Sequence, residues 1–277
     1  MPTKDCSMTN LNDVKEFWDK ASCGEVYATG SDWKEKYDAQ KISRYVLEPY
    51  VRGFAKFDES AGKDILEIGV GMGADHEEFA LAQPASLRGI DLTDKAIEHC
   101  KKRFQILGLS SLLELGNAEL LNFQSNSFDV VYSCGVIHHS PNTEEAVREI
   151  YRVLRQGGVA RVMIYHRYSP VGFLLWTRYA LLKGRPWLGL NHIYDEYLES
   201  PGTKAYTVSE AKEMFSQFSS IDVSVICSSG DLLYGEAGQR HRGILLSLAK
   251  ILWPRSVVKW ISKRFNFGLY LLIEARK

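Results

Sequence analysis

Short apolar runs alternate with amphipathic stretches along most of this chain. The apolar runs predict strands, and they cover residues 64–68, 86–90, 112–115, 128–133, 159–165, 221–227 and 267–274. Apolar residues at helical spacing fill most of the segments between them. Strands that alternate with helices predict a parallel sheet covered on both faces, which is a Rossmann-like, doubly wound α/β fold.

Three polar residues mark the expected starts of helices after strands. Thr93, Asn142 and Thr207 each precede an amphipathic stretch and can accept a hydrogen bond from a free backbone N–H of the first turn. Glu145 and Glu210 follow the last two by three residues, which is the spacing of a capping box. These signals fix where the predicted helices begin.

The rest of the chain divides into an extension and two insertions. Residues 1–60 are predicted to form a helical extension and a lid, and residues 61–277 the main domain. Insertions at about 166–206 and 229–265 each follow a strand and are rich in aromatic residues. Since loops at the carboxyl ends of parallel strands form the ligand crevice of such folds, both insertions are candidate substrate elements.

Composition excludes several classes of protein. The 277 residues are 45% hydrophobic and 25% charged, as in ordinary globular proteins. The five cysteines are scattered without a C-x-x-C pair, which argues against a disulfide framework or a zinc knuckle and fits a reducing compartment. Neither a signal-peptide pattern nor a membrane-spanning apolar run of about 18 residues is present, so we expect a cytoplasmic protein.

Glycines and an acid mark a candidate nucleotide site. Gly69, Gly71 and Gly73 lie between a strand and a helix, where they permit a sharp turn and close approach of a ligand. Asp91 ends the next strand, where an acid can accept hydrogen bonds from ribose hydroxyls. Together they predict an adenosine-type ligand at the first crossover.

The same glycines, followed by Ala74, also fit a dinucleotide fingerprint, so an NAD(P)-dependent oxidoreductase is an alternative. A pyrophosphate would lie on the start of the following helix. Four acids surround that position, namely Glu67, Asp75, Glu77 and Glu78. This charge is unfavourable for a pyrophosphate and favours a cationic sulfonium ligand.

Residues 63–165 resemble the class I S-adenosylmethionine-dependent methyltransferases, through ILEIGVGMG at residues 65–73, FDVVYSCGVIHH at 128–139 and LRQGG at 154–158. The resemblance implies a seven-stranded sheet whose last strand runs antiparallel. It also implies S-adenosylmethionine as cofactor. In that family the methionine part would contact Glu67, Gly69, Gly71, Gly73 and Cys134. The ribose would contact Asp91 and Leu92, and the adenine would contact Asn117, Ala118 and Glu119. Asn117 departs from the family, which often has Asp there.

Three side chains are further candidates for the reaction. His138 and His139 follow the fourth predicted strand, where the loop faces the transferred methyl group in this family, and an imidazole is available as a base near neutral pH. Tyr50 is a candidate cap for the methionine carboxylate, with packing in a helix core as the alternative. No metal site is predicted.

The acceptor is predicted to be a small molecule, methylated at oxygen, with carbon and nitrogen left open. Residues 133–136 lack the Asn/Asp-Pro-Pro-aromatic signature of enzymes that methylate nucleic-acid amines, so no nucleic-acid partner is expected. A protein that binds the cofactor without catalysis is the other alternative.

Basic and aromatic residues mix without acids at 161–190, and again in the tail. Nine Lys/Arg and one acid lie within 240–277. This pattern is typical of interfacial helices and suggests an amphiphilic or lipid-linked acceptor, or peripheral contact with the inner membrane surface. A solvated face over buried helices, or a homodimer contact, is the alternative.

Overall fold

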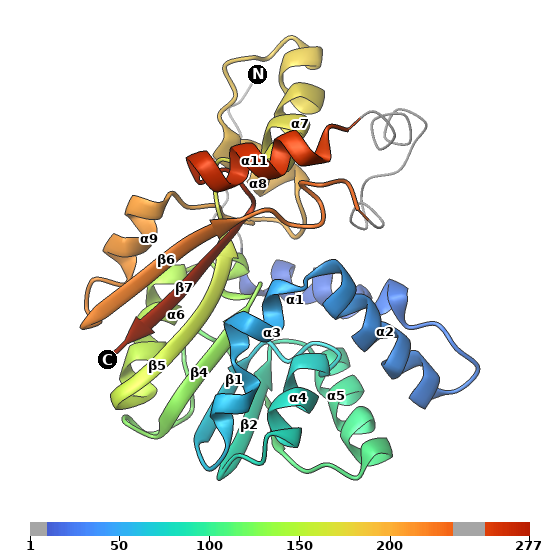
Figure 1. Ribbon diagram of the computed structural model, residues 1–277, viewed down its shortest axis with the longest axis vertical. Coiled ribbons are helices and arrows are strands. Elements are labelled where there is room, and N and C mark those ends of the chain that lie inside the picture. Colours follow the sequence, from blue (N-terminus) through green and yellow to red (C-terminus); the bar gives the residue numbers. More distant parts are fainter. Residues whose placement is uncertain (1–9, 235–252) are drawn as a thin grey trace.

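The computed structural model describes residues 10–234 and 253–277 and contains one seven-stranded sheet in the order β3-β2-β1-β4-β5-β7-β6 (Figure 1). The strands are β1 (Asp64–Ile68), β2 (Ser86–Asp91), β3 (Leu112–Leu115), β4 (Phe128–Cys134), β5 (Leu154–Tyr165), β6 (Ser220–Ile226) and β7 (Tyr270–Arg276). The strands from β3 to β5 pair in parallel, and β7 runs antiparallel between β5 and β6. The predicted doubly wound fold with an antiparallel last strand is confirmed.

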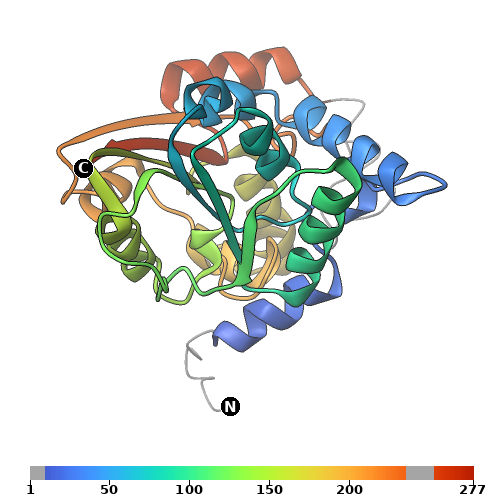
Figure 2. The same cartoon turned by 90° about the horizontal axis from the view of Figure 1, so that it is seen from below.

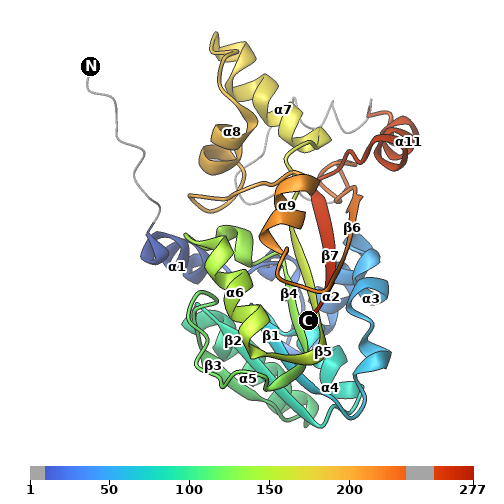
Figure 3. The ribbon, with the colours of Figure 1, turned by 90° about the vertical axis from the view of Figure 1, so that its left-hand side faces the viewer.

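The helices surround this sheet. In chain order they are α1 (Leu11–Lys20), η1 (Glu25–Tyr27), α2 (Trp33–Leu47), α3 (Tyr50–Ala55), η2 (Phe57–Ser60), α4 (Ala74–Leu81), α5 (Asp94–Leu107), η3 (Ile137–His139), α6 (Thr143–Val153), α7 (Pro170–Tyr179), η4 (Leu181–Lys183), α8 (Leu190–Tyr197), α9 (Val208–Met214) and α11 (Arg255–Phe265). Side chains of α6 and α9 pack on one face of the sheet, and those of α3, α4 and α5 on the other (Figure 3).

Local sequence signals explain where these helices begin and which side chains they bury. Val147, Ile150 and Val153 of α6 are fully buried, because their spacing places them on the face toward the sheet. Thr93 accepts from the backbone N–H of Ala96 at 3.3 Å. At α9, Thr207 and Glu210 form the predicted reciprocal capping box.

The box predicted at α6 is only half formed. Asn142 accepts from the N–H of Glu145 at 3.1 Å, as expected of an N-cap. Its own N–H, however, donates to Glu119 at 2.7 Å and not to Glu145. Glu145 instead pairs with Arg148 on the exposed side of the helix.

The extension over residues 10–60 is helical; α1, α2 and the residues just before η1 supply side chains at the carboxyl ends of the strands, and α3 packs on a face of the sheet. Helix α2 ends before Pro49, which is the N-cap residue of a new helix, α3. Two apolar residues of α2, Ile42 and Val46, are exposed by 65% and 71%, whereas Tyr37 is buried. Figure 2 shows α1 beside α5, where Lys15 pairs with Asp94 at 2.7 Å.

Parts of the predictions lie outside the described residues, namely Cys6 and residues 235–252 of the second insertion. The four described cysteines are free thiols. Within residues 10–234 and 253–277, every helix is too short or too polar to cross a bilayer.

Candidate active site

A cavity of about 200 Å³ opens where β1, β2, β4 and β5 end. Eight of the predicted site residues line it: Gly69, Gly71, Asp91, Leu92, Asn117, Ala118, Cys134 and His139. Side chains of the extension form another wall, with Trp18 from α1, Cys23 before η1, and Arg44 from α2. The extension therefore contributes to the site and is more than an attached segment.

The three loop glycines differ in what surrounds them, although all have positive φ (83°, 50° and 79°). A Cβ on Gly69 would meet Val136 at 2.2 Å, and one on Gly73 would meet the Cys100 thiol at 2.7 Å. A Cβ on Gly71 would meet nothing within 4 Å. Packing therefore requires the outer two glycines, while Gly71 leaves space at the cavity.

Asp91 is held in place by the loop it faces. One carboxylate oxygen accepts from the Gly71 N–H at 3.0 Å, and the other accepts from the N–H and hydroxyl of Thr93 at 3.0 and 2.9 Å. Burial raises the pKa of Asp91 above its usual range. A carboxylate offers about four acceptor positions, so one remains for a ligand hydroxyl.

Asn117 and Ala118 follow β3 and lie in the cavity wall. The side-chain oxygen of Asn117 accepts from the N–H of Glu119 at 3.0 Å, which fixes the amide in a local turn. This oxygen retains one acceptor position for an adenine amino group.

Besides Glu67, four predicted site residues lie outside the cavity wall. Glu119 is turned toward α6, where its carboxylate accepts from Asn142. Gly73 packs on Cys100. The Tyr50 ring packs on Tyr270 at 5.4 Å between centroids, and its hydroxyl lies 3.8 Å from the Cys134 thiol. His138, the fourth, is described below.

Glu67 also lies outside the wall, in a buried polar chain. Its carboxyl group lies 2.8 Å from Nδ1 of His76, and Nε2 of His76 lies 2.7 Å from the hydroxyl of Ser111. That hydroxyl donates to the carbonyl of Leu87, so it accepts from Nε2. Burial raises the pKa of Glu67 and lowers the pKa of His76 to about 3, which places the shared proton on the carboxyl group.

The acids at the start of α4 do not present free negative charge to a ligand, because basic side chains neutralise them. The carboxylate of Asp75 pairs with Arg44 at 2.7 Å. Glu77 and Glu78 share Lys41, at 2.6 and 2.5 Å. Since Lys41 and Arg44 come from α2, the extension supplies the compensating charge.

His139 lines the cavity and has defined partners on one side of its ring. Its Nδ1 lies 2.9 Å from the Ser200 hydroxyl and 3.1 Å from that of Thr203. The Thr203 hydroxyl donates to the Ser200 carbonyl at 2.7 Å, so toward His139 it accepts. This assigns the hydrogen to Nδ1 and leaves Nε2 as an acceptor.

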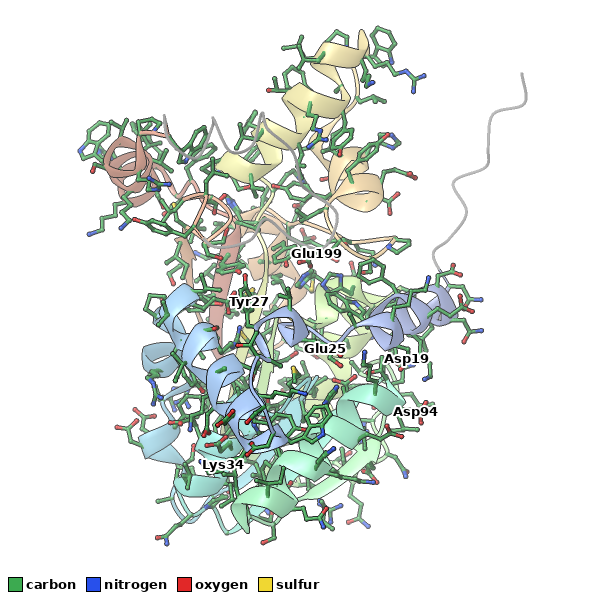
Figure 4. All side chains as sticks on the ribbon, turned by 90° about the vertical axis from the view of Figure 1, so that its right-hand side faces the viewer. Asp19, Glu25, Tyr27, Lys34, Asp94 and Glu199 are labelled. Atoms are coloured by element: carbon green, nitrogen blue, oxygen red, sulfur yellow. The ribbon has the colours of Figure 1, made fainter. Side chains whose placement is uncertain are left out.

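Nε2 of His139 faces a carboxylate that the sequence patterns do not single out. Oε2 of Glu199, in the first insertion, lies 3.4 Å away and accepts from the Tyr165 hydroxyl at 2.8 Å. Figure 4 shows Glu199 above η1, on the side of the molecule where α1 lies. Two acceptor atoms thus lie side by side at the cavity.

His138 is fully buried beneath this pair. Its ring packs against Tyr165 at a tilt of 40°, with centroids 4.0 Å apart, and neither ring nitrogen has a hydrogen-bond partner among the described residues. The ligand atoms of His138, His139 and Glu199 lie within 4.8 Å of one another. Two imidazoles and a carboxylate are a set that can hold a divalent cation.

The buried His138 predicts acid sensitivity. Burial lowers its pKa well below 6.5, so below pH 6.5 the unfolded chain binds a proton that the folded chain does not, and stability falls as pH falls. From pH 6 to pH 5 this one group removes about 1 kcal/mol of unfolding free energy. Urea titrations measure this free energy. Between pH 6 and pH 5, the unfolding free energy of His138→Gln should fall by about 1 kcal/mol less than that of the wild type. His192→Gln, at an exposed site on α8, should follow the wild type; equal pH slopes for all three proteins would contradict the assignment.

Known proteins are similar to this chain over most of the residues that form the site. Residues 66–162 match a family model described as a methyltransferase domain. The matched residues run from within β1 to within β5 and include most of the cavity loops, so the predicted resemblance to the class I S-adenosylmethionine-dependent methyltransferases is confirmed over this part of the chain. S-adenosylmethionine is the cofactor of this class.

Three relatives have names that refer to lipids. The chain is 43% identical over 100 residues to a phthiotriol/phenolphthiotriol dimycocerosates methyltransferase of Mycobacterium leprae, with 35% of this chain and 36% of that protein covered. It is 33% identical over 122 residues to a fatty-acid O-methyltransferase of Mycolicibacterium smegmatis, with 44% and 43% covered. It is 32% identical over 128 residues to a sterol 24-C-methyltransferase of Pneumocystis carinii, with 46% and 33% covered. The chain thus matches less than half the length of each.

Solved structures show the same fold. A Haemonchus contortus phosphoethanolamine N-methyltransferase in complex with S-adenosylhomocysteine matches with a TM-score of 0.58 and 16% identity, covering 95% of this chain and 60% of that one. The cyclase SpnF matches with a TM-score of 0.59 and 16% identity, covering 97% of both chains. Because the cyclase shares this fold, the fold alone does not define the reaction.

Proposed function

We propose that this protein transfers a methyl group from S-adenosylmethionine to a hydroxyl of a lipid-related small molecule. The observation that carries the proposal is the pair formed by Nε2 of His139 and Oε2 of Glu199, 3.4 Å apart at the cavity. Both atoms accept hydrogen bonds in the assigned tautomer. The space beside them therefore suits a group that brings a proton, and a hydroxyl is such a group.

The residues around the cavity fit the cofactor. Gly71 leaves open space, Asp91 keeps one acceptor position for a ribose hydroxyl, and Asn117 keeps one for adenine. When bound, S-adenosylmethionine supplies a methyl group on a positively charged sulfur that is already activated toward displacement. The protein's part is then to align the acceptor and exclude water.

His139 would act as the general base. The acceptor oxygen forms a bond to the methyl carbon while the carbon–sulfur bond breaks, and the hydroxyl proton moves to Nε2. The Nδ1–H remains bonded to Ser200 and Thr203, which keeps the ring oriented. Glu199 stabilises the imidazolium that results, because its carboxylate lies beside Nε2.

The lipid-related acceptor rests on two observations. The three relatives are named for lipid substrates, and the cavity includes apolar and aromatic walls from Leu11, Val14, Trp18, Met163 and Tyr165. The base favours oxygen over carbon, because an alkene carbon has no acidic proton to give before attack. Methylation at carbon, as named for the sterol enzyme, is the second candidate.

Labelled methyl donor identifies the acceptor. The purified chain is incubated with methyl-labelled S-adenosylmethionine and a total lipid extract, and labelled products are identified by mass spectrometry. A labelled methyl ether supports the proposal. A labelled methyl ester would show a carboxylate acceptor, which brings no proton to His139, and would overturn the hydroxyl assignment, while a label on carbon or nitrogen overturns the oxygen assignment. Tight cofactor binding without any labelled product would favour a protein that binds the cofactor without catalysis.

Asp91→Ala tests the cofactor site separately. Loss of a charge-assisted hydrogen bond costs about 1–3 kcal/mol, so we expect S-adenosylhomocysteine to bind about 5- to 150-fold more weakly by calorimetry. Asp129→Ala, at the opposite end of β4, removes a carboxylate that pairs with Arg155 and should leave binding unchanged. Equal affinity of the Asp91 variant and the wild type would exclude Asp91 as the ribose ligand.

A further inference from the structure

Two helical segments present large apolar side chains to solvent at the same end of the molecule. We call them the basic-aromatic face. From α7, η4 and the loop after them come Phe173, Leu181, Leu182 and Trp187; from α11 come Val257, Trp260 and Phe265. Trp187 and Trp260 are 75% and 64% exposed. Side chains of this size are usually buried, and a group of them on the surface marks an interaction site.

The two segments that carry this face are basic. Residues 168–189 and 253–266 contain no acid. Six basic residues lie there without a carboxylate partner within residues 10–234 and 253–277: Arg178, Lys183, Arg185, Lys259, Lys263 and Arg264. Elsewhere in this protein exposed bases commonly pair with acids, as Lys34 does with Asp38.

The two segments are held together by one buried residue. The carboxylate of Asp231 accepts from the N–H of Val171, at the start of α7, at 3.1 Å. Its backbone carbonyl accepts from the indole N–H of Trp253, just before α11, at 2.9 Å. The rings of Phe173 and Phe267 also meet, with centroids 5.8 Å apart. Figures 1 and 3 show α7 and α11 at the same end of the molecule, beyond β5.

This face lies on the same side as the cavity. Strand β5 ends at Tyr165, which lines the cavity, and α7 begins five residues later at Pro170. Helix α11 is amphipathic, with Val258 and Ser262 buried and Val257 and Trp260 exposed. The basic-aromatic face and the cavity therefore both lie at the carboxyl end of β5.

We infer that the basic-aromatic face docks the protein on an anionic lipid bilayer. Tryptophan and phenylalanine enter the interfacial region of a bilayer, and Lys/Arg beside them attract anionic headgroups. Since the two segments contain no acid of their own, neither adds repulsion toward an anionic surface. Docking goes beyond the proposed methyl transfer and is tested without cofactor or acceptor, so either proposal can fail alone.

Vesicle flotation with the full chain tests the inference. Vesicles contain phosphatidylcholine alone or phosphatidylcholine with 30% phosphatidylglycerol, in 0.1 M salt. We expect flotation with the anionic vesicles, little with the neutral ones, and loss at 0.5 M salt because of screening. Absence of flotation with anionic vesicles overturns the inference.

Two variants separate the apolar and charged contributions. Trp187→Ala/Trp260→Ala should reduce the partition coefficient at least tenfold by removing both exposed indoles. Lys259→Ala/Lys263→Ala should reduce it about 25-fold, since each basic residue near an anionic surface contributes about fivefold. Leu112→Ala/Lys101→Ala changes an exposed apolar and a basic residue away from the face and should float like the wild type.

Partners of the basic-aromatic face other than a bilayer would give different results in these experiments. If the tryptophan variant abolishes a dimer seen by light scattering while vesicles have no effect, the face is a contact between copies and the inference is wrong. If the lysine variant loses binding to heparin or RNA while vesicles do not bind, a polyanion is the partner and the inference is also wrong. The changed side chains are exposed, so thermal unfolding should stay close to wild type.

Discussion

His139→Ala should lower kcat by about 10²- to 10⁴-fold, the range that general-base catalysis contributes. The substitution removes the Nε2 acceptor at the cavity but leaves Gly71, Asp91 and Asn117 in place. The affinity for S-adenosylhomocysteine should therefore change by about twofold or less. Single-turnover rates with labelled methyl donor, together with calorimetry, measure both quantities.

Two further variants test whether Glu199 assists His139 in the reaction. Glu199→Gln removes the negative charge beside Nε2 and should lower kcat by a smaller factor than His139→Ala, without changing KM for the cofactor. His192→Ala, an exposed histidine of the same insertion, is the matched control and should have wild-type kcat. A chelator added to the wild type should leave kcat unchanged if His139 acts as a base. It should lower kcat if His138, His139 and Glu199 hold a metal that the reaction needs. Wild-type turnover of the His139 variant would remove it from the mechanism.

The frame of this fold follows from signals that are local in the chain. The apolar run of β1 and the N-caps Thr93 and Thr207 depend on residues within a few positions of one another. Parallel order then follows from the alternation of strands and helices. Each of these signals is complete within about 20 residues, so the sequence alone contains them.

Contacts between side chains that are far apart in the sequence could not be predicted in this way. Arg44 meets Asp75 from 31 positions away, and Glu199 meets His139 from 60 positions away. Nothing in the local pattern marks Glu199, which lies in a polar Ser-Pro-Gly-Thr loop. Glu119 likewise has a suitable position after β3, yet its carboxylate caps α6. Such roles depend on how separate elements pack, which periodicity does not encode.

The class of protein was predicted correctly although one supporting argument fails. Counting acids near the start of α4 neglects Lys41 and Arg44, which lie in the extension and neutralise them. The motifs themselves carried the identification, because glycine loop, Asp91 and the strand-four loop occur in the family's order. Charge inferred from sequence neighbours is weaker evidence than charge inferred from spatial neighbours.

Gly71→Ala should weaken cofactor binding at least tenfold while the protein still folds. Residue 71 has φ of 50°, where a Cβ costs about 1–2 kcal/mol of stability. Apart from the neighbours of Gly71 in the chain, no atom of residues 10–234 and 253–277 lies within 4 Å of the added methyl group, so it occupies cavity space that a ligand needs. Gly108→Ala is the matched control, because Gly108 has φ of 64°, an equally open Cβ position and a place at the end of α5.

The two glycine variants should lose similar stability and differ in binding. Thermal unfolding measures the first quantity, and calorimetry with S-adenosylhomocysteine the second. If both variants bind like the wild type, Gly71 serves the turn alone and the ligand lies elsewhere in the cavity. If only Gly71→Ala binds weakly, the loss arises from the blocked space and not from strain, because Gly108→Ala carries the same strain.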